Sequence, residues 1–133
     1  MAQTIPIPAA GGDPGASPFL DCERLDCFRV AVEFQTMAAE LGSRRRLGAL
    51  RDQLDRASVS IVLNIAEGAG RRTPADKAHF FTIARGSATE CAAVLELLAA
   101  HSLMTTEAHR NGRGLVVRIV QMLTRLIERH ARP

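Results

Sequence analysis

The chain has 133 residues, a formal net charge of +3 and a hydrophobic content of 47%. This length suits one domain with a single core, and the absence of Trp and Tyr argues against a surface that stacks bases on aromatic rings. Three cysteines without a Cys-x-x-Cys pair, and the lack of a signal-peptide pattern or an apolar run of about 18 residues, predict a cytoplasmic protein with reduced thiols and no membrane contact.

Arginine dominates the positive charge, because Lys77 is the only lysine among the 17 cationic residues. Arg binds phosphate and carboxylate groups with two parallel hydrogen bonds and stays charged when partly buried, so the bias suits a surface that binds phosphate or a partner. A GC-rich genome, whose codons favour Arg, Ala and Gly, would produce the same bias. Both explanations stay open at this point.

Residues 1–20 are rich in proline and glycine and carry little charge, so we expect a flexible tail. Residues 21–41 predict the first helix, because apolar side chains recur every three or four positions, and Gly42 suits the left-handed residue beyond its end. Its apolar stripe consists of Cys27, Val30, Phe34, Met37 and Leu41. Ser43 can cap a second helix that ends at Gly68. The stripe of that helix consists of Leu47, Leu50, Leu54, Ala57 and Ile61.

Thr73 followed by Pro74 is a strong start signal for a third helix, because Thr caps the free amides and Pro fits the first helical position. The stripe of this helix consists of Phe80, Ala84, Ser87, Cys91, Val94 and Leu98. A fourth helix opens at Thr105 or Thr106. Its stripe consists of Val116, Ile119, Leu123 and Leu126.

Four helices joined by short connections predict an all-α fold, an antiparallel up-and-down four-helix bundle over residues 21–133. Two stretches, 57–66 and 91–100, are apolar or small on nearly every side. A helix that is apolar all round is buried all round, and the outward side of a four-helix bundle can be covered only by another subunit. We therefore expect the protein to form a homo-oligomer.

A two-part motif spans the second and third predicted helices. It reads Arg-Ala-x-x-Ser-Ile-x-x-Asn-Ile-Ala-Glu-Gly, then Gly-Arg, then Phe-x-x-Ile-Ala-x-Gly-Ser-x-x-Glu. Its residues are Arg56, Ala57, Ser60, Ile61, Asn64, Ile65, Ala66, Glu67, Gly68, Gly70, Arg71, Phe80 (or Phe81), Ile83, Ala84, Gly86, Ser87 and Glu90. With this motif the chain resembles the four-helix-bundle family of large-subunit ribosomal RNA intervening-sequence proteins, which includes the accessory variability determinant of diversity-generating retroelements.

The resemblance implies a barrel-like homopentamer of four-helix protomers that is positively charged, binds nucleic acid (RNA or DNA) and has no enzymatic activity. In the retroelement branch it also implies a reverse transcriptase as partner. The family brings no catalytic residues. Departures from its pattern are the Pro-rich tail, the Val62-Leu63 pair before Asn64, where the family often has a Pro, and an Arg-rich fourth helix.

The motif residues have a structural interpretation that does not require a ligand. Asn64 continues the apolar stripe, so we expect it to point inward and fix the turn over residues 68–73 through backbone hydrogen bonds, with a ligand role as the alternative. Glu67 lies at the negative end of the helix dipole, so it should pair with Arg71 or Arg72.

Glu90 has the same kind of structural interpretation. Folding the third helix back on the second brings Glu90 close to Arg51 and Arg56, and an ion pair with one of them is expected. We therefore expect a structural role, and not ligand binding, for the motif residues Asn64, Glu67, Gly68, Ser87 and Glu90.

Catalytic motifs are missing from the sequence. It contains no His-Glu-x-x-His, no phosphate-cradling loop and no nucleophile elbow, and its four histidines are scattered. We expect that the protein is not an enzyme and that it binds no metal and no cofactor.

Two groups of arginines remain as candidates for phosphate contact. Arg44, Arg45 and Arg46 open the second helix, where cations oppose the helix dipole and so are not explained by helix stability. The other group follows one face of the fourth helix, where an ordinary solvated face is the alternative. The candidate nucleic-acid-binding residues are Arg44, Arg45, Arg46, Arg71, Arg72, Arg118, Arg125 and Arg129. The alternative function is a protein-interaction scaffold whose arginines only solubilise it.

Overall fold

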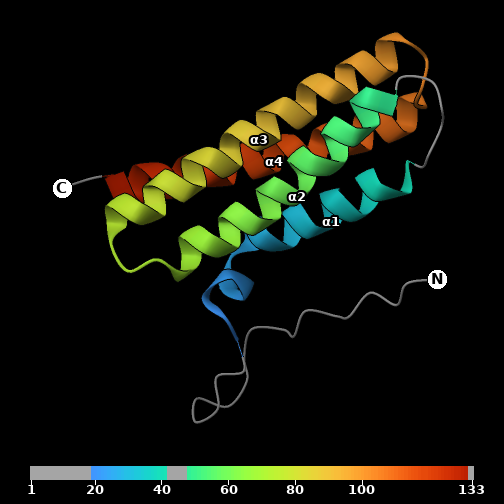
Figure 1. Cartoon of the computed structure of the whole chain (residues 1–133). Coiled ribbons are helices and arrows are strands. Elements are labelled where there is room, and N and C mark those ends of the chain that lie inside the picture. The colour runs from blue at the N-terminus through green and yellow to red at the C-terminus, as the bar shows by residue number, and fades with distance from the viewer. Residues whose placement is uncertain (1–18, 42–47, 132–133) are drawn as a thin grey trace.

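Four α-helices and one 3₁₀ turn make up the computed structural model, which describes residues 19–41 and 48–131 (Figure 1). In chain order the elements are η1 (Asp21–Arg24), α1 (Asp26–Glu40), α2 (Gly48–Gly70), α3 (Pro74–Ala100) and α4 (Thr106–Ala131). The all-α prediction is confirmed. The predicted tail falls outside the described residues except for Phe19 and Leu20. The predictions for Gly42, Ser43, Arg44, Arg45, Arg46 and Leu47 also lie outside the described residues.

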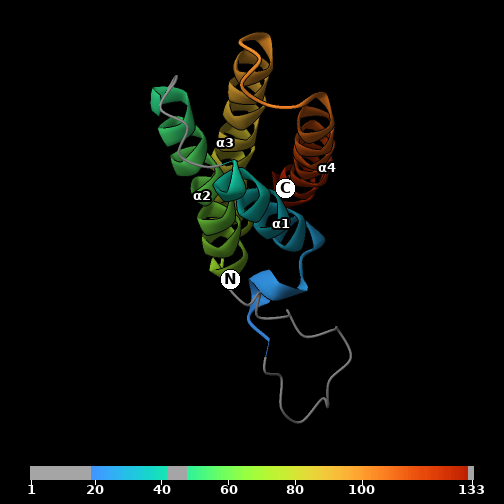
Figure 2. The same cartoon turned by 90° about the vertical axis from the view of Figure 1, so that its right-hand side faces the viewer.

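The helices form the predicted up-and-down bundle. Each packs against the next one along the chain and α1 also packs against α4, whereas α1 and α3, like α2 and α4, lie diagonally across the bundle and are not neighbours. Figure 2 shows α2 and α4 on either side of α3. The face built from α2 and α3 is therefore opposite the face built from α4 and α1.

The core is formed by the predicted apolar stripes, with some changes at their edges. Phe34, Ile61 and Ile119 have no exposed surface. Phe81 rather than Phe80 is the core aromatic residue of α3, with a side chain that is 1% exposed. The outer stripe residues Met37, Leu41, Leu50 and Leu126 are only partly buried. None of the helices in the described part of the chain has the length and apolarity that a membrane crossing requires.

The first predicted helix is broken near its start, which corrects the continuous helix expected over residues 21–41. Leu25 is extended, with φ −93° and ψ 127°, and separates η1 from α1. The break places Cys22 and Cys27 on the bundle, where both side chains are buried. Packing on the bundle thus overrides a local sequence that favours an unbroken helix.

α2 ends at Gly70, not at Gly68 as predicted. A Cβ atom on Gly68 would lie 2.9 Å from ring carbons of Phe81, so this glycine permits close packing of α2 and α3 inside the helix. The start of α3 is as predicted, because Thr73 Oγ1 accepts a hydrogen bond from the amide of Asp76 at 3.1 Å and Pro74 is the first helical residue. Lys77 Nζ donates to the Ala69 carbonyl at 2.8 Å and so caps the end of α2.

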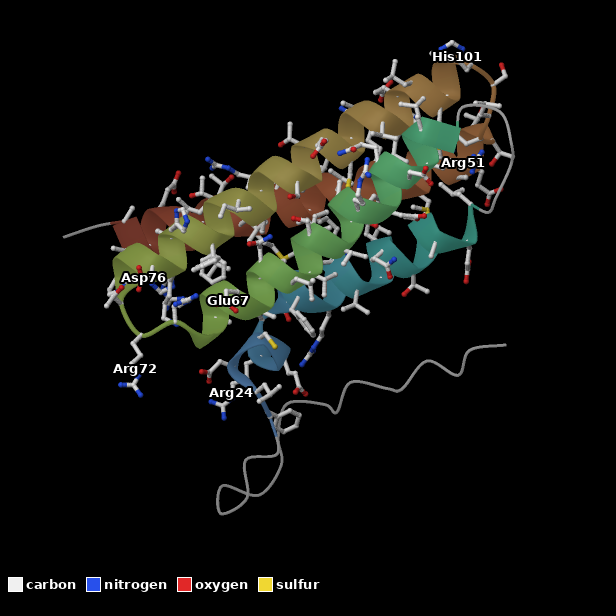
Figure 3. All side chains as sticks on the ribbon, viewed as in Figure 1. Arg24, Arg51, Glu67, Arg72, Asp76 and His101 are labelled. Carbon is white, nitrogen blue, oxygen red and sulfur yellow. The ribbon has the colours of Figure 1, made fainter. Side chains whose placement is uncertain are left out.

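Arg51 closes the opposite end of the bundle (Figure 3). Its side chain is only 8% exposed, and it donates to the Leu41 carbonyl at 2.6 Å and to the Leu103 carbonyl at 3.2 Å. One guanidinium group thus joins the end of α1 and the α3–α4 connection to α2.

Candidate functional site

The motif residues line the seam between α2 and α3 on its outer side. Ser60 Oγ and Ser87 Oγ are 2.9 Å apart across the seam, and Gln53 Nε2 donates to Glu90 Oε1 one to two turns away. These contacts put polar groups in a row along two helices whose inner faces are apolar. We call this row the α2–α3 seam.

Asn64 belongs to this seam, and its predicted bond to the following turn is wrong. Its amide Nδ2 donates to the Ser60 carbonyl at 2.9 Å and to Ser60 Oγ at 3.0 Å, and its side chain is half-buried. Helical side chains lean toward the N-terminus, so the amide reaches back one turn and not forward to residues 68–73. Ile65 takes the core position instead, with no exposed surface.

Glu67 forms the predicted ion pair with Arg71, one turn further along the chain. The Arg71 guanidinium also lies over the Phe80 ring, 4.6 Å from its centroid. Arg72 is exposed and points away from the bundle (Figure 3). Of the two arginines in this turn, only Arg72 keeps its charge free of a carboxylate among the described residues.

Glu90 does not pair directly with an arginine, which corrects the expected ion pair. It accepts from Gln53, whose Oε1 accepts from Arg56 at 2.9 Å, so the amide stands between the two charges. Arg51 is turned inward to the loop carbonyls and is not available to Glu90.

Apolar side chains are exposed on the outer sides of α2 and α3. Val59 is 40% exposed, Leu63 61% and Ile83 39%. Val59 and Leu63 are one turn apart on α2. Because the helices are antiparallel and Ser60 meets Ser87, Ile83 lies at the level of Leu63. We call these three residues the α2–α3 patch; the sequence indicated an outward apolar side here but not which residues form it.

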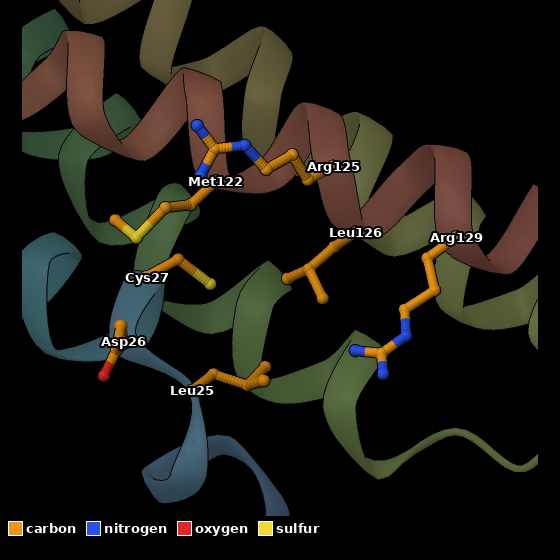
Figure 4. Close-up of a pocket in the computed structure, with 7 residues that line it drawn as sticks. All are labelled: Leu25, Asp26, Cys27, Met122, Arg125, Leu126 and Arg129. Atoms are coloured by element: carbon orange, nitrogen blue, oxygen red, sulfur yellow. The ribbon is translucent and has the colours of Figure 1, made fainter.

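The arginines of α4 lie on the opposite side of the bundle. Arg118, Arg125 and Arg129 are all exposed, as predicted from their spacing. Arg125 and Arg129 also line a hollow of about 210 Å³ between α4 and the start of α1, which we call the side hollow. The sequence did not predict this hollow. Figure 4 shows this side hollow, with Asp26 pointing away from the two guanidinium groups.

The antiparallel topology gathers four of the eight candidate arginines at one end. Arg71 and Arg72 in the α2–α3 turn are at the same end of the bundle as Arg125 and Arg129 near the end of α4 (Figure 1). Arg118 lies further along α4 and lines neither this turn nor the side hollow.

The buried thiols are poor nucleophiles. Burial raises the pKa of Cys27 to about 11 and that of Cys91 to about 12, so both are protonated at neutral pH. Within the described ranges, 19–41 and 48–131, no three His, Cys, Asp or Glu side chains are grouped to hold a metal ion.

The molecule belongs to the class of antiparallel four-helix bundles. Its surface carries a polar seam, an exposed apolar patch and a face with arginines. The chain belongs to the 23S rRNA-intervening sequence protein family, whose model matches residues 23–125. It is similar to a solved structure from Bacteroides thetaiotaomicron, described as a protein with unknown function from the S23 ribosomal protein family. The TM-score is 0.72 at 24% identity, covering 77% of this chain and 95% of that one. That likeness shows the fold. Comparison with curated proteins finds no significant match.

Proposed function

We propose that the protein is a non-catalytic, homo-oligomeric scaffold that associates with RNA or DNA through its arginines. The observation that carries this proposal is the division of its surface into two opposite faces. One face, built from α2 and α3, exposes apolar side chains, and the other carries the arginines of α4.

The α2–α3 patch supports self-association. Val59, Leu63 and Ile83 gather on two neighbouring helices, and clustered exposed apolar side chains typically mark a protein interface. The α2–α3 seam offers hydroxyl and amide groups that a second copy would meet in a fixed register. Five copies is the number that the resemblance to the intervening-sequence proteins implies.

The arginines of α4 lie on the opposite side of the bundle from the α2–α3 patch. Because α4 is diagonal to α2, its exposed side chains are not part of the surface that the patch presents to a second copy. Arg118, Arg125 and Arg129 have no ion-pair partner among the residues that the structure describes. Their charges are thus available to phosphate groups, and repetition around an oligomer would multiply them.

The test is the salt dependence of binding to single-stranded and double-stranded RNA and DNA of unrelated sequences. Each arginine that contacts a phosphate adds roughly 0.7 to 0.9 to the slope of log affinity against log salt concentration. Replacing Arg118, Arg125 and Arg129 together by Gln should weaken binding and flatten the slope, while the circular dichroism spectrum stays the same. Binding should depend little on sequence, because no aromatic platform is present to read bases.

The same exchange at Arg44, Arg45 and Arg46 is the matched comparison, since those residues form the other arginine group. If neither triple variant changes the affinity or the salt slope, the nucleic-acid proposal is wrong. A protein-interaction scaffold would then be the better account. The pairing of Arg71 with Glu67 favours that alternative, because it shows that one candidate arginine is already neutralised.

A further inference from the structure

A hollow exists at one end of the bundle because α1 is short. α1 has 15 residues whereas α3 has 27, lengths of about 22 Å and 40 Å at the helical rise. Within residues 19–41, the part of the chain before α2 that the structure describes, the single turn η1 precedes α1 and packs against α2. The result is a hollow of about 360 Å³, which we call the end hollow.

Basic side chains from three elements line the end hollow. Arg24 comes from η1, Lys77 from α3 and His130 from α4, and Asp21 is the one acidic residue in its lining. The floor is apolar and includes Phe81, which is 1% exposed and whose ring centroid is 5.9 Å from that of His130. An apolar floor limits the screening of the charges above it.

The end hollow adjoins the side hollow, since Leu25 and Leu126 line both. Arg125 and Arg129 line the adjoining side hollow, and of the two Arg129 acts on His130, whose pKa its charge helps to lower. Two helix ends bring negative dipole charge to this region, but Lys77 already satisfies the Ala69 carbonyl at the end of α2. The balance of side-chain charge in the two hollows is positive.

The pKa of His130 is affected by these positive charges. This pKa is lowered by burial and by the charges of Lys77 and Arg129. The other charged groups that line the end hollow are Asp21 and Arg24 on η1, whereas α2 contributes only the uncharged Ala69. An anion bound beside the imidazole would raise the pKa of His130, opposite to the lowering caused by Lys77 and Arg129.

We propose that a phosphate group binds where the end hollow meets the side hollow, held by the charges of Lys77 and Arg129 and by a hydrogen bond from the imidazole of His130. This inference rests on the proposed function, because the phosphate would be the terminal phosphate of a bound nucleic acid. The hollow is a short recess at the end of the bundle and not a groove along it, so it suits a chain end. Free phosphate offers the same chemistry, and the test separates the two sources.

The first experiment measures the pKa of His130 by nuclear magnetic resonance in inorganic phosphate and in chloride at equal ionic strength. Phosphate should raise the pKa by about half a unit or more, because a nearby negative charge favours the imidazolium form. His130→Gln assigns the resonance among the four histidines. His79, which is exposed on α3 and lines neither hollow, should not respond.

The second experiment compares one oligonucleotide with a 5′-phosphate and with a 5′-hydroxyl group. The phosphorylated form should bind about tenfold more tightly, as expected for one charge-assisted contact. Arg129→Gln and His130→Gln should each reduce this ratio toward one. Arg113→Gln is the matched control, because Arg113 is an exposed arginine of α4 that lines neither hollow, and it should keep the ratio.

Equal binding of both oligonucleotides, together with a His130 pKa that phosphate leaves unchanged, would overturn the inference and leave the proposed function intact. A phosphate-dependent pKa without any oligonucleotide binding would refute the proposed function and overturn the terminal-phosphate assignment, with free phosphate as the ligand. A preference for the 5′-phosphate that survives in both Arg129→Gln and His130→Gln would place the contact elsewhere and also overturn it.

Discussion

Gly68 lies inside α2 at a point where α3 leaves no room for a side chain. A Cβ there would be 2.9 Å from Phe81 and 3.1 Å from Phe80 Cβ, whereas a Cβ on Gly114 in α4 would meet open space. Gly68→Ala should therefore lower the free energy of unfolding by about 1–3 kcal/mol, through overpacking. Gly114→Ala should raise it by about 1 kcal/mol, because Ala is the better helix former. Urea unfolding measures both free energies. If Gly68→Ala raised the free energy of unfolding, α2 and α3 would not require a glycine at this contact, and the prediction would be wrong.

His130 links stability to pH. Its pKa is lowered in the folded protein, first by burial and then by Lys77 and Arg129, so the native state favours the neutral imidazole. The folded state thus binds fewer protons than the unfolded state as the pH falls below the ordinary value of 6.5. The stability contributed above that value is lost as the pH decreases through this window.

His130→Gln removes the titrating group and keeps a polar side chain of similar reach. Between pH 8 and pH 5 the free energy of unfolding of the native sequence should decrease more than that of the variant. The carboxylates are common to both proteins and cancel in the difference. Parallel curves over this range would mean that His130 is protonated as easily in the folded chain as in the unfolded one.

At the scale of the elements, Arg51 connects three segments that are far apart in sequence. Its guanidinium satisfies the carbonyls of Leu41 and Leu103, which would otherwise lose their protein partners. Arg51→Met should lower the free energy of unfolding by about 2 kcal/mol, because an unsatisfied buried carbonyl such as that of Leu103 costs about 1–3 kcal/mol and the part-buried carbonyl of Leu41 loses its bond as well. Arg56→Met is the control on the same helix, exposed and bonded only to Gln53 among the described residues. An equal effect of both changes would exclude the role of Arg51 as a clamp.

The helices could be predicted because their signals are local. Periodic apolar residues, the Thr73-Pro74 start and the Glu67–Arg71 spacing all lie within one or two turns. The break at Leu25 could not be predicted, since no Gly or Pro marks it and packing on the bundle decides it. The end of α3 could not be predicted for the same reason. Ser102 adopts a left-handed φ of 56°, and the sequence has no glycine there that would indicate it.

The site was predicted less completely than the fold, because its geometry depends on contacts between helices. The motif residues were recognised, but the seam became visible only when Ser87 was placed opposite Ser60. An arginine in a helical pattern is usually a surface residue, so the burial of Arg51 needs the two loop carbonyls to be known. The hollows exist only because α1 is shorter than its neighbours.

At the scale of the whole molecule, the proposed function requires assembly through the face that α2 and α3 form. Val59 and Val117 provide a matched pair, because both are valines that are 40% exposed, one in the α2–α3 patch and the other on α4. Of the neighbours of Val117 one turn away, Arg113, Gly114 and Gln121 are exposed and not hydrophobic, and Val120 is partly buried against the core, so Val117 has no exposed apolar neighbour on α4. Replacing each by Glu distinguishes an interface from ordinary exposed surface.

The most direct test is the molar mass in solution, measured by light scattering at micromolar concentration. The native chain should give a multiple of its 14.4 kDa, with five copies corresponding to about 72 kDa. Val59→Glu and Leu63→Glu should shift the mass to that of the single chain while keeping the helical content, and Val117→Glu should leave the oligomer unchanged. A native chain that measures 14.4 kDa under these conditions would contradict the account.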